Sequence, residues 1–263
     1  MSAVEKKSIE QCLLMSDIHT KVASSLALAK QIEEFGLMNA ITTAIAVSPE
    51  FPAKPHLVEF TQLPKRGMAS EESRIILMHA IAHIEFSAIH LAWDAVCRFD
   101  GMPEQYYLDW ARIAGDESRH FLMIEEYLSQ RGVKYGDFDA HDGLWKMAQD
   151  TAHDVLIRMA IVPRVLEARG LDVTPGMIKK LQQVGDKDAV AILEIIYREE
   201  ITHVDAGSHW FRYLCEQRHL DADETFKQTI DDYYASQLRG PFNREGRKAA
   251  GFSQNELDWL FSI

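Results

Sequence analysis

Cysteine is scarce in this sequence. Only Cys12, Cys97 and Cys215 occur among the 263 residues, far apart and without a Cys-x-x-Cys pair. An odd number of isolated cysteines excludes a disulfide framework and offers no cysteine-rich metal motif. We therefore interpret them as packing residues of a protein in a reduced, cytoplasmic compartment.

Long apolar runs and positive charge are also in short supply. No stretch approaches the roughly 20 apolar residues of a membrane span, and the N-terminus opens no apolar run long enough for a signal peptide. The 28 Lys and Arg residues face 40 Asp and Glu residues, which gives a formal net charge of −12. Because nucleic-acid binders usually carry a basic face, this balance argues against such a partner. We expect neither a membrane nor a nucleic acid to be bound.

The sequence contains no P-loop, no G-x-G-x-x-G and no G-x-S-x-G. Nucleotide binding and acyl transfer therefore have no support. What the chain does have is 47% hydrophobic and 26% charged residues, enough for a sizeable core in one main domain with appendages or in two small domains.

Helical periodicity dominates the chain. It predicts an amphipathic helix from Cys12 to Ile32 and four long helices further on. Between them, Pro49, Pro52, Pro55 and Pro64 interrupt a segment that we expect to be a loop-rich strap. The four long helices are predicted over about 70–99, 103–130, 141–168 and 186–216, with the third stopped by Gly170 and Pro175.

Each long helix would measure roughly 40 Å, and the connection of residues 132–142 can extend along that length. This is the long crossover of a ferritin-like bundle. The predicted fold is all-α: an N-terminal helix and strap at 1–69, a ferritin-like four-helix bundle at 70–217 and a short C-terminal helical cap at 218–263. Pro163 should kink the third helix, four residues before Glu167.

Six residues form an ordered pattern, in which each half has a lone Glu followed about 32 residues later by Glu-x-x-His. Residues three apart share a helix face, so each Glu-x-x-His can offer a carboxylate and an imidazole to one point. Carboxylate oxygens with two imidazole nitrogens suit two divalent ions, iron(II) first, with manganese(II) or a mixed pair as alternatives. The predicted ligands are Glu85, Glu117, His120, Glu167, Glu200 and His203.

A third Glu-x-x-His, from Glu216 to His219, lies at a predicted helix end and has no partner Glu. One such motif is expected by chance in a chain rich in Glu with 11 His residues. The prediction of a two-metal site therefore depends on the pairing of two motifs, each with its own lone Glu.

Residues beside the predicted ligands could support them. A ligating His usually donates its other ring N–H to a carboxylate, so we expect Asp116 to accept from His203 and Glu199 to accept from His120. Arg119 is then a candidate ion-pair partner of one of these carboxylates. The alternative is that all three lie on solvated helix surface.

Other polar and aromatic residues have two interpretations each. Four polar residues on one stripe of the first long helix are explained by interhelical hydrogen bonds or a subunit contact, or alternatively by a second metal site. Two tyrosines near the ligands are explained by core packing, or alternatively by hydrogen bonding or radical storage at the metals. These residues are His79, His83, His90 and Asp94, and Tyr127 and Tyr197.

Several longer stretches resemble a bacterial ferritin-like family catalogued as domain of unknown function 455. The resemblance covers nearly the whole chain and implies a ferritin-like fold with a two-metal centre, without a settled substrate. The stretches are His79-Ala-Ile-Ala-His-Ile-Glu85, Asp116-Glu-Ser-Arg-His-Phe121, Tyr135-Gly-Asp137, Ala140-His-Asp-Gly-Leu-Trp145, Val162-Pro-Arg-Val-Leu-Glu-Ala-Arg-Gly-Leu-Asp172, Glu200-Ile-Thr-His-Val204 and Gly240-Pro-Phe-Asn243.

Two functions follow from a two-metal site. The first is an oxidoreductase that activates O₂ or peroxide to oxidise a small organic substrate, with an electron-donor protein as a potential partner. The alternative is a non-catalytic metal-binding or iron-handling protein. Because the strap and tail disfavour a closed storage shell, we expect a monomer or small homo-oligomer. Hydroxylation of a modified tRNA base is a third hypothesis, which the acidic balance weakens.

Overall fold

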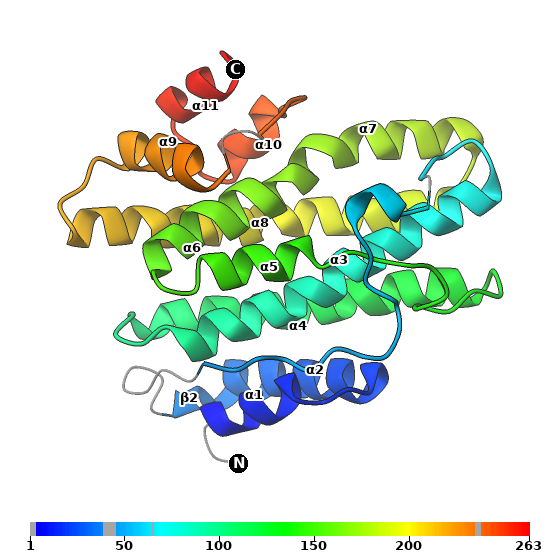
Figure 1. The fold of residues 1–263 in the computed structure, drawn as a ribbon, viewed down its shortest axis with the longest axis horizontal. Coiled ribbons are helices and arrows are strands. Elements are labelled where there is room, and N and C mark those ends of the chain that lie inside the picture. Colours follow the sequence, from blue (N-terminus) through cyan, green and yellow to red (C-terminus); the bar gives the residue numbers. More distant parts are fainter. Residues whose placement is uncertain (1–3, 39–45, 65, 235–237) are drawn as a thin grey trace. The chain divides into compact units, whose positions relative to one another are not determined.

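The computed structural model describes residues 4–38, 46–64, 66–234 and 238–263. Their regular structure is helical, apart from β1 (Val4–Glu5) and β2 (Leu37–Met38), which pair in parallel (Figure 1). The all-α class is therefore confirmed. The chain divides into two compact units, residues 1–145 and 146–263. The expected division at 1–69, 70–217 and 218–263 stays a prediction.

The first unit is built around a hairpin of two long helices, α3 and α4, which lie side by side in Figure 1. Ser70 begins α3, because its hydroxyl accepts the backbone N–H of Ser73 and the Ser73 hydroxyl accepts that of Ser70, both at 3.2 Å. The unit contains α1 (Lys6–Leu13), α2 (Ile18–Phe35), the short turn η1 (Phe60–Gln62), α3 (Glu71–Arg98), α4 (Glu104–Ser129) and the start of α5 (Gly143–Asp150).

Among the described residues, α3 is the one helix that is long and apolar enough to cross a membrane by length and composition. Its most apolar window is 78% buried within the protein. The buried core helices of soluble proteins pass the same test.

The second helix, α2, packs against α4. The Ser25 hydroxyl accepts hydrogen bonds from Trp93 Nε1 and Ser118 Oγ, both at 2.8 Å, and so ties α2 to α3 and α4. The prediction of a single helix over Cys12–Ile32 was wrong, because α1 ends at Leu13 and α2 begins at Ile18. Asp17 starts the new helix by accepting the Thr20 backbone N–H at 2.8 Å.

The described part of the strap is loop-rich, as its prolines predict. Between Met38 and Glu71, its described residues form no helix longer than the three-residue η1. It is paired with the connection that follows α4. The backbone N–H of Val58 donates to the Ala140 carbonyl at 2.8 Å, and that of Ala140 donates to the His56 carbonyl at 2.9 Å. The buried Lys21 ammonium also donates to the carbonyl of Glu50.

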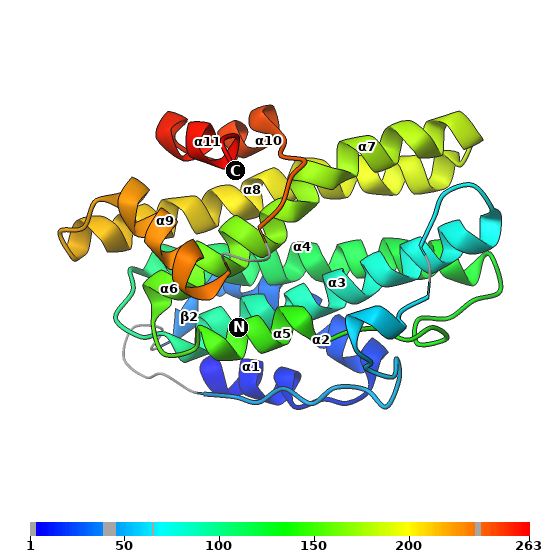
Figure 2. The same ribbon diagram turned by 45° about the horizontal axis from the view of Figure 1, so that its top comes forward.

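The second unit contains a helical hairpin, whose α7 and α8 run side by side in Figures 1 and 2. Gly185, with φ of 78°, ends α7 in the left-handed region, and Asp186 caps α8 by accepting the Ala189 N–H. The remaining helices of the unit pack on this hairpin or on one another. The elements are α6 (Val155–Ile161), the π-helical turn η2 (Val162–Glu167), α7 (Ala168–Val184), α8 (Lys187–Gln217), α9 (Ala222–Tyr233), α10 (Arg244–Ala249) and α11 (Gln254–Leu260).

The third predicted helix differs from the prediction at both ends. The segment 141–168 is broken after α5, because Asp154 caps a new helix by accepting the Leu156 N–H at 2.8 Å. The helix then continues through Gly170 and Pro175 to Val184. Pro175 supplies no N–H to the carbonyl of Leu171, but the Asn243 side chain donates to that carbonyl at 3.0 Å.

The expected disturbance at Pro163 takes the form of the π turn η2, which begins at Val162 and ends at Glu167. The Pro163 ring packs directly on α8 at Gly207. A Cβ atom on Gly207 would lie 2.4 Å from both Cβ and Cγ of Pro163. A glycine at position 207 therefore allows this close approach of the two segments.

Candidate metal centre

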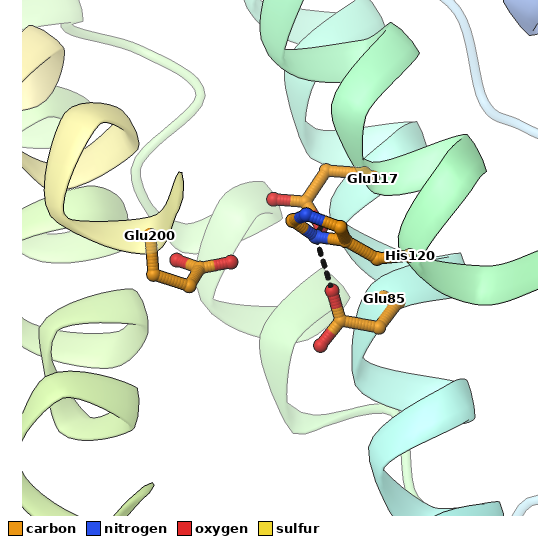
Figure 3. A group of neighbouring side chains, drawn as sticks. All are labelled: Glu85, Glu117, His120 and Glu200. Carbon is orange, nitrogen blue, oxygen red and sulfur yellow. Dashed lines mark hydrogen bonds and ion pairs between the residues drawn. The ribbon is translucent and has the colours of Figure 1, made fainter. Parts of the chain in front are cut away.

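Glu85 of α3 and the pair Glu117 and His120 of α4 converge inside the first unit (Figure 3). The three residues are 3%, 1% and 0% exposed. Their candidate ligand atoms lie within 4.8 Å of one another. His120 Nδ1 is 3.1 Å from Glu85 Oε2 and 3.4 Å from Glu117 Oε2. The first half of the predicted ligand set is thus a buried cluster of the kind that can hold a metal ion.

The charges of this cluster favour a cation. Burial by itself lowers the pKa of His120, but the hydrogen bonds and charges of Glu117 and Glu85 outweigh it and raise the pKa to about 11. Without metal, this pKa keeps His120 protonated, and its Nδ1 donates to Glu85 Oε2. Two carboxylates with one imidazolium leave a net negative charge, and a ligating His must be neutral, so a divalent ion can replace the proton.

A cluster of three aromatic rings joins α3 to α4. Phe86 follows Glu85 and Phe121 follows His120, and the two rings lie 5.4 Å apart between centroids. The Tyr135 ring contacts both, at 5.5 Å and 5.0 Å. Sequence reasoning assigned no role to these aromatic residues, because their spacing is that of ordinary core positions.

The second unit contains Glu200, which is also labelled in Figure 3, and His203, both on α8. His203 Nδ1 lies 3.5 Å from Glu200 Oε1, and the His203 side chain is fully buried. One carboxylate and one imidazole therefore project from one face of α8, as their spacing predicts.

Glu167 is the last residue of the π turn η2 and is half-buried. The contact between Pro163 and Gly207 sets its level along α8, because the two segments belong to one antiparallel hairpin. Glu167 lies four residues after Pro163, and His203 lies four residues before Gly207. Because the two segments are antiparallel, Glu167 and His203 lie at the same level along the hairpin. Both hairpins thus have a lone Glu on the first segment at the level of Glu-x-x-His on the second.

The residues predicted to support the ligands make contacts along their own helices. Asp116 accepts from Arg119 Nη2 at 2.8 Å and from Arg112 Nη1 at 3.0 Å. Glu199 lies 3.8 Å from the guanidinium of Arg198. The expected hydrogen bonds from His203 to Asp116 and from His120 to Glu199 stay predictions.

The polar stripe of α3 makes hydrogen bonds to other elements, as its simpler interpretation predicts. His79 Nε2 accepts the Gly136 N–H at 2.8 Å. His83 Nδ1 lies 2.8 Å from the Tyr135 hydroxyl, and His90 Nε2 lies 2.8 Å from Lys21 Nζ. The fourth residue, Asp94, instead binds Arg98 one turn further along α3.

The remaining candidates also have defined contacts. The Tyr127 ring lies under the Arg131 guanidinium, 3.6 Å from its centroid. The Tyr197 hydroxyl accepts from Asn243 Nδ2 at 3.0 Å. Glu216 and His219 of the third motif are both exposed, and His219 lies beyond the end of α8 with φ of 56°. This motif does not form a site of the same kind.

Comparison with known proteins identifies relatives without giving an activity. The family model described as "Protein of unknown function (DUF455)" matches residues 14–258. An "Uncharacterized protein" of Haemophilus influenzae is 44% identical over 261 residues, which span 97% of this chain and 89% of that protein. No solved structure matches the chain. With the family model spanning nearly the whole length, the chain belongs to the DUF455 family of proteins of unknown function.

Proposed function

We propose that this protein holds two metal ions between a pair of helical hairpins and uses them for oxidation chemistry. In this proposal the α3–α4 and α7–α8 hairpins form a ferritin-like four-helix bundle with a long crossover between them. The observation that carries the proposal is the buried cluster of Glu85, Glu117 and His120, with candidate ligand atoms within 4.8 Å of one another.

The internal repeat supports a second ion. Each unit contains a lone Glu and a Glu-x-x-His at matching levels of an antiparallel hairpin. One half alone supplies two carboxylates and one imidazole, which is a partial ligand set for a metal ion. With both halves together, four carboxylates balance two divalent cations, which removes the large penalty of burying uncompensated charge.

The donor types favour iron(II), with manganese(II) or a mixed pair as alternatives. Each half supplies carboxylate oxygens and one imidazole, and no thiolate belongs to the predicted ligand set. All three cysteines are buried and unbonded to one another. A pair of such ions supplies one electron from each metal to O₂ or peroxide when bound.

The protein side of the chemistry is the placement of these ligands in a dry core. Glu85 and Glu117 hold the ions and balance their charge, while His120 gives up its proton to become a neutral ligand. The near-complete burial of Glu85, Glu117 and His120 keeps bulk water away from the first half-site. In this proposal the loaded site would oxidise a small organic substrate, with an electron-donor protein as its partner.

The test uses the third Glu-x-x-His as a matched control. Wild-type protein is loaded anaerobically with iron(II), freed of excess metal, analysed for iron per chain and then exposed to O₂. Two iron ions per chain and iron-dependent O₂ consumption are expected. The double variant E200A/H203A should lose bound iron and O₂ consumption, whereas E216A/H219A should keep both.

Two outcomes would revise the proposal. Wild-type protein that binds no iron or manganese above background would contradict the metal site. Protein that binds two ions and yet is silent towards both O₂ and peroxide would support the alternative, a non-catalytic metal-binding or iron-handling protein.

A further inference from the structure

The C-terminal helices hold the hairpin of the second unit through a small set of buried and half-buried polar contacts. Asn243, which precedes α10, donates from Nδ2 to the carbonyl of Leu171 and to the hydroxyl of Tyr197, both at 3.0 Å. Its Oδ1 accepts the Gly246 N–H at 3.1 Å and so caps α10. One side chain therefore joins α7, α8 and the start of α10.

Each of the two groups that accept a hydrogen bond from Asn243 Nδ2 lies about one helical turn from a proposed ligand. Leu171 comes four residues after Glu167, and Tyr197 comes three residues before Glu200. The Leu171 carbonyl is open to a side-chain donor because Pro175 has no N–H to offer it. Asn243 thus supplies the hydrogen bond that Pro175 cannot donate to the Leu171 carbonyl.

Arg247 of α10 holds the other end of the same turn. Its guanidinium binds both oxygens of Asp172, with Nε to Oδ1 at 2.9 Å and Nη2 to Oδ2 at 2.8 Å. Its Nη1 donates to the carbonyl of Arg164 at 3.3 Å. Arg164 lies three residues before Glu167, so contacts from α10 bracket Glu167 on both sides.

We expect this ion pair to orient the backbone segment it binds and to add little to the free energy of unfolding. Arg247 is 1% exposed and the Asp172 side chain is fully buried. A buried ion pair is often no more stabilising than apolar residues of the same volume, because desolvating two charges offsets their attraction. A planar, bidentate pair does fix direction, which makes it suited to holding a backbone segment in place.

The segment that is held has an unusual conformation. π-helical turns are rare and occur mostly as single turns, frequently at functional sites. One residue of a regular helix corresponds to a rotation of about 100°, so relaxing η2 to a regular helix would turn Glu167 to a different face. The contacts of Arg247 and Asn243 lie on either side of the residue whose direction this turn decides.

We propose that Asn243 and Arg247 are positioning residues of the second half-site. They lock the π turn that ends at Glu167 against the helix that carries Glu200 and His203, and so set the metal affinity of a site that they do not touch. This proposal rests on the proposed function, because it takes these three residues as ligands.

Asn243→Asp is the sharpest test. The carboxylate keeps the acceptor that caps α10 but removes both N–H donors, which leaves the Leu171 carbonyl unpaired. Arg247→Lys is the second variant, since a lysine keeps the charge without the bidentate geometry. Arg244→Ala is the matched control, because Arg244 lies on the same helix and its ion pair with Asp258 is exposed.

The full-length proteins are titrated with manganese(II) to measure the number of ions per chain and each dissociation constant. Wild type and R244A should bind two ions alike. N243D and R247K should bind at least one ion about 10- to 100-fold more weakly, the range seen when residues supporting metal ligands are changed. In the metal-free state, amide hydrogen exchange over residues 164–172 should be faster in both variants.

A double variant separates positioning from simple stabilisation. Adding Pro175→Ala to N243D gives the Leu171 carbonyl an N–H donor within its own helix. If Asn243 acts as a positioning residue, the melting temperature should recover while manganese binding stays weak. Recovery of wild-type affinity in the double variant, or wild-type binding by N243D and R247K, would overturn the positioning role alone. A wild-type chain without metal would overturn the proposed function and this proposal with it.

Discussion

The packing of Pro163 on Gly207 predicts a large difference between two glycine substitutions in the same hairpin. An alanine at position 207 would place its Cβ 2.4 Å from two carbons of the Pro163 ring, which cannot rotate away. An alanine at Gly170, on the facing helix α7, meets nothing within 4 Å. Both positions lie inside helices, so the two changes share the same intrinsic effect on helix formation.

Two opposing free-energy changes decide whether each substitution stabilises the protein. Replacing glycine by alanine inside a helix stabilises by about 1 kcal/mol, and G170A should show this gain in full. Overpacking typically destabilises by about 1–3 kcal/mol. The rigid ring places G207A at the upper end of that range, so it should be less stable than wild type by up to about 2 kcal/mol. At roughly 2–4 °C per kcal/mol, the melting temperatures of the two variants should differ by several degrees.

Thermal unfolding followed by circular dichroism in the presence of a chelator measures this difference without any contribution from metal. A manganese titration then reports whether the displaced Pro163 also shifts Glu167, in which case G207A should bind its second ion more weakly. The reasoning fails if G207A melts at or above the temperature of G170A.

Three further predictions concern the first unit. Burial lowers the pKa of His79 to about 4, and its Nε2 accepts from Gly136, so the folded chain binds fewer protons there than the unfolded chain between pH 6.5 and 4. Stability from this residue is complete above pH 6.5 and falls by roughly 3 kcal/mol towards pH 4. Urea unfolding at both pH values should show a smaller loss in His79→Gln. Lys21→Met should destabilise by about 2 kcal/mol in the same assay at pH 7, because the Glu50 carbonyl loses a buried donor; an unchanged midpoint would mean that this tie is dispensable. His120→Ala should weaken manganese binding by more than tenfold while leaving the helical circular dichroism spectrum unchanged, and equal affinity would remove His120 from the ligand set.

Much of the fold could be predicted because its signals are local. Ser70 and Asp186 cap α3 and α8, where the sequence predicts these helices to begin. Asp17 and Asp154 are caps of the same kind, but the prediction did not treat them as helix starts. Each begins a helix inside a segment predicted to be one continuous helix. A single capping residue within an apolar pattern is a weak signal, since Asp is also common on helix surfaces.

The error at Pro175 has a different cause. A proline in a helix normally ends it because a carbonyl loses its donor. Here the donor comes from Asn243, 68 positions further along the chain, and local periodicity carries no information about such a contact. The stretch Gly240-Pro-Phe-Asn243 was among those that resembled the family, so a signal existed without a role attached to it.

The candidate site could be predicted in part because metal ligands need fixed spacing on helices. The spacing identified Glu85, Glu117 and His120, which the fold brings together, and it identified Glu200 with His203 as one face of α8. Spacing cannot show how a ligand is aimed. That depends on the π turn at Glu167 and on its contacts with α10, both of which are set by tertiary packing.

The central claim is that six side chains hold two adjacent metal ions. X-ray absorption of protein loaded with two iron(II) ions per chain tests it most directly. We expect only nitrogen and oxygen ligands and a second iron at the roughly 3.5–4 Å typical of two-metal sites. Isolated iron ions with no metal neighbour, or sulfur in the coordination shell, would contradict it.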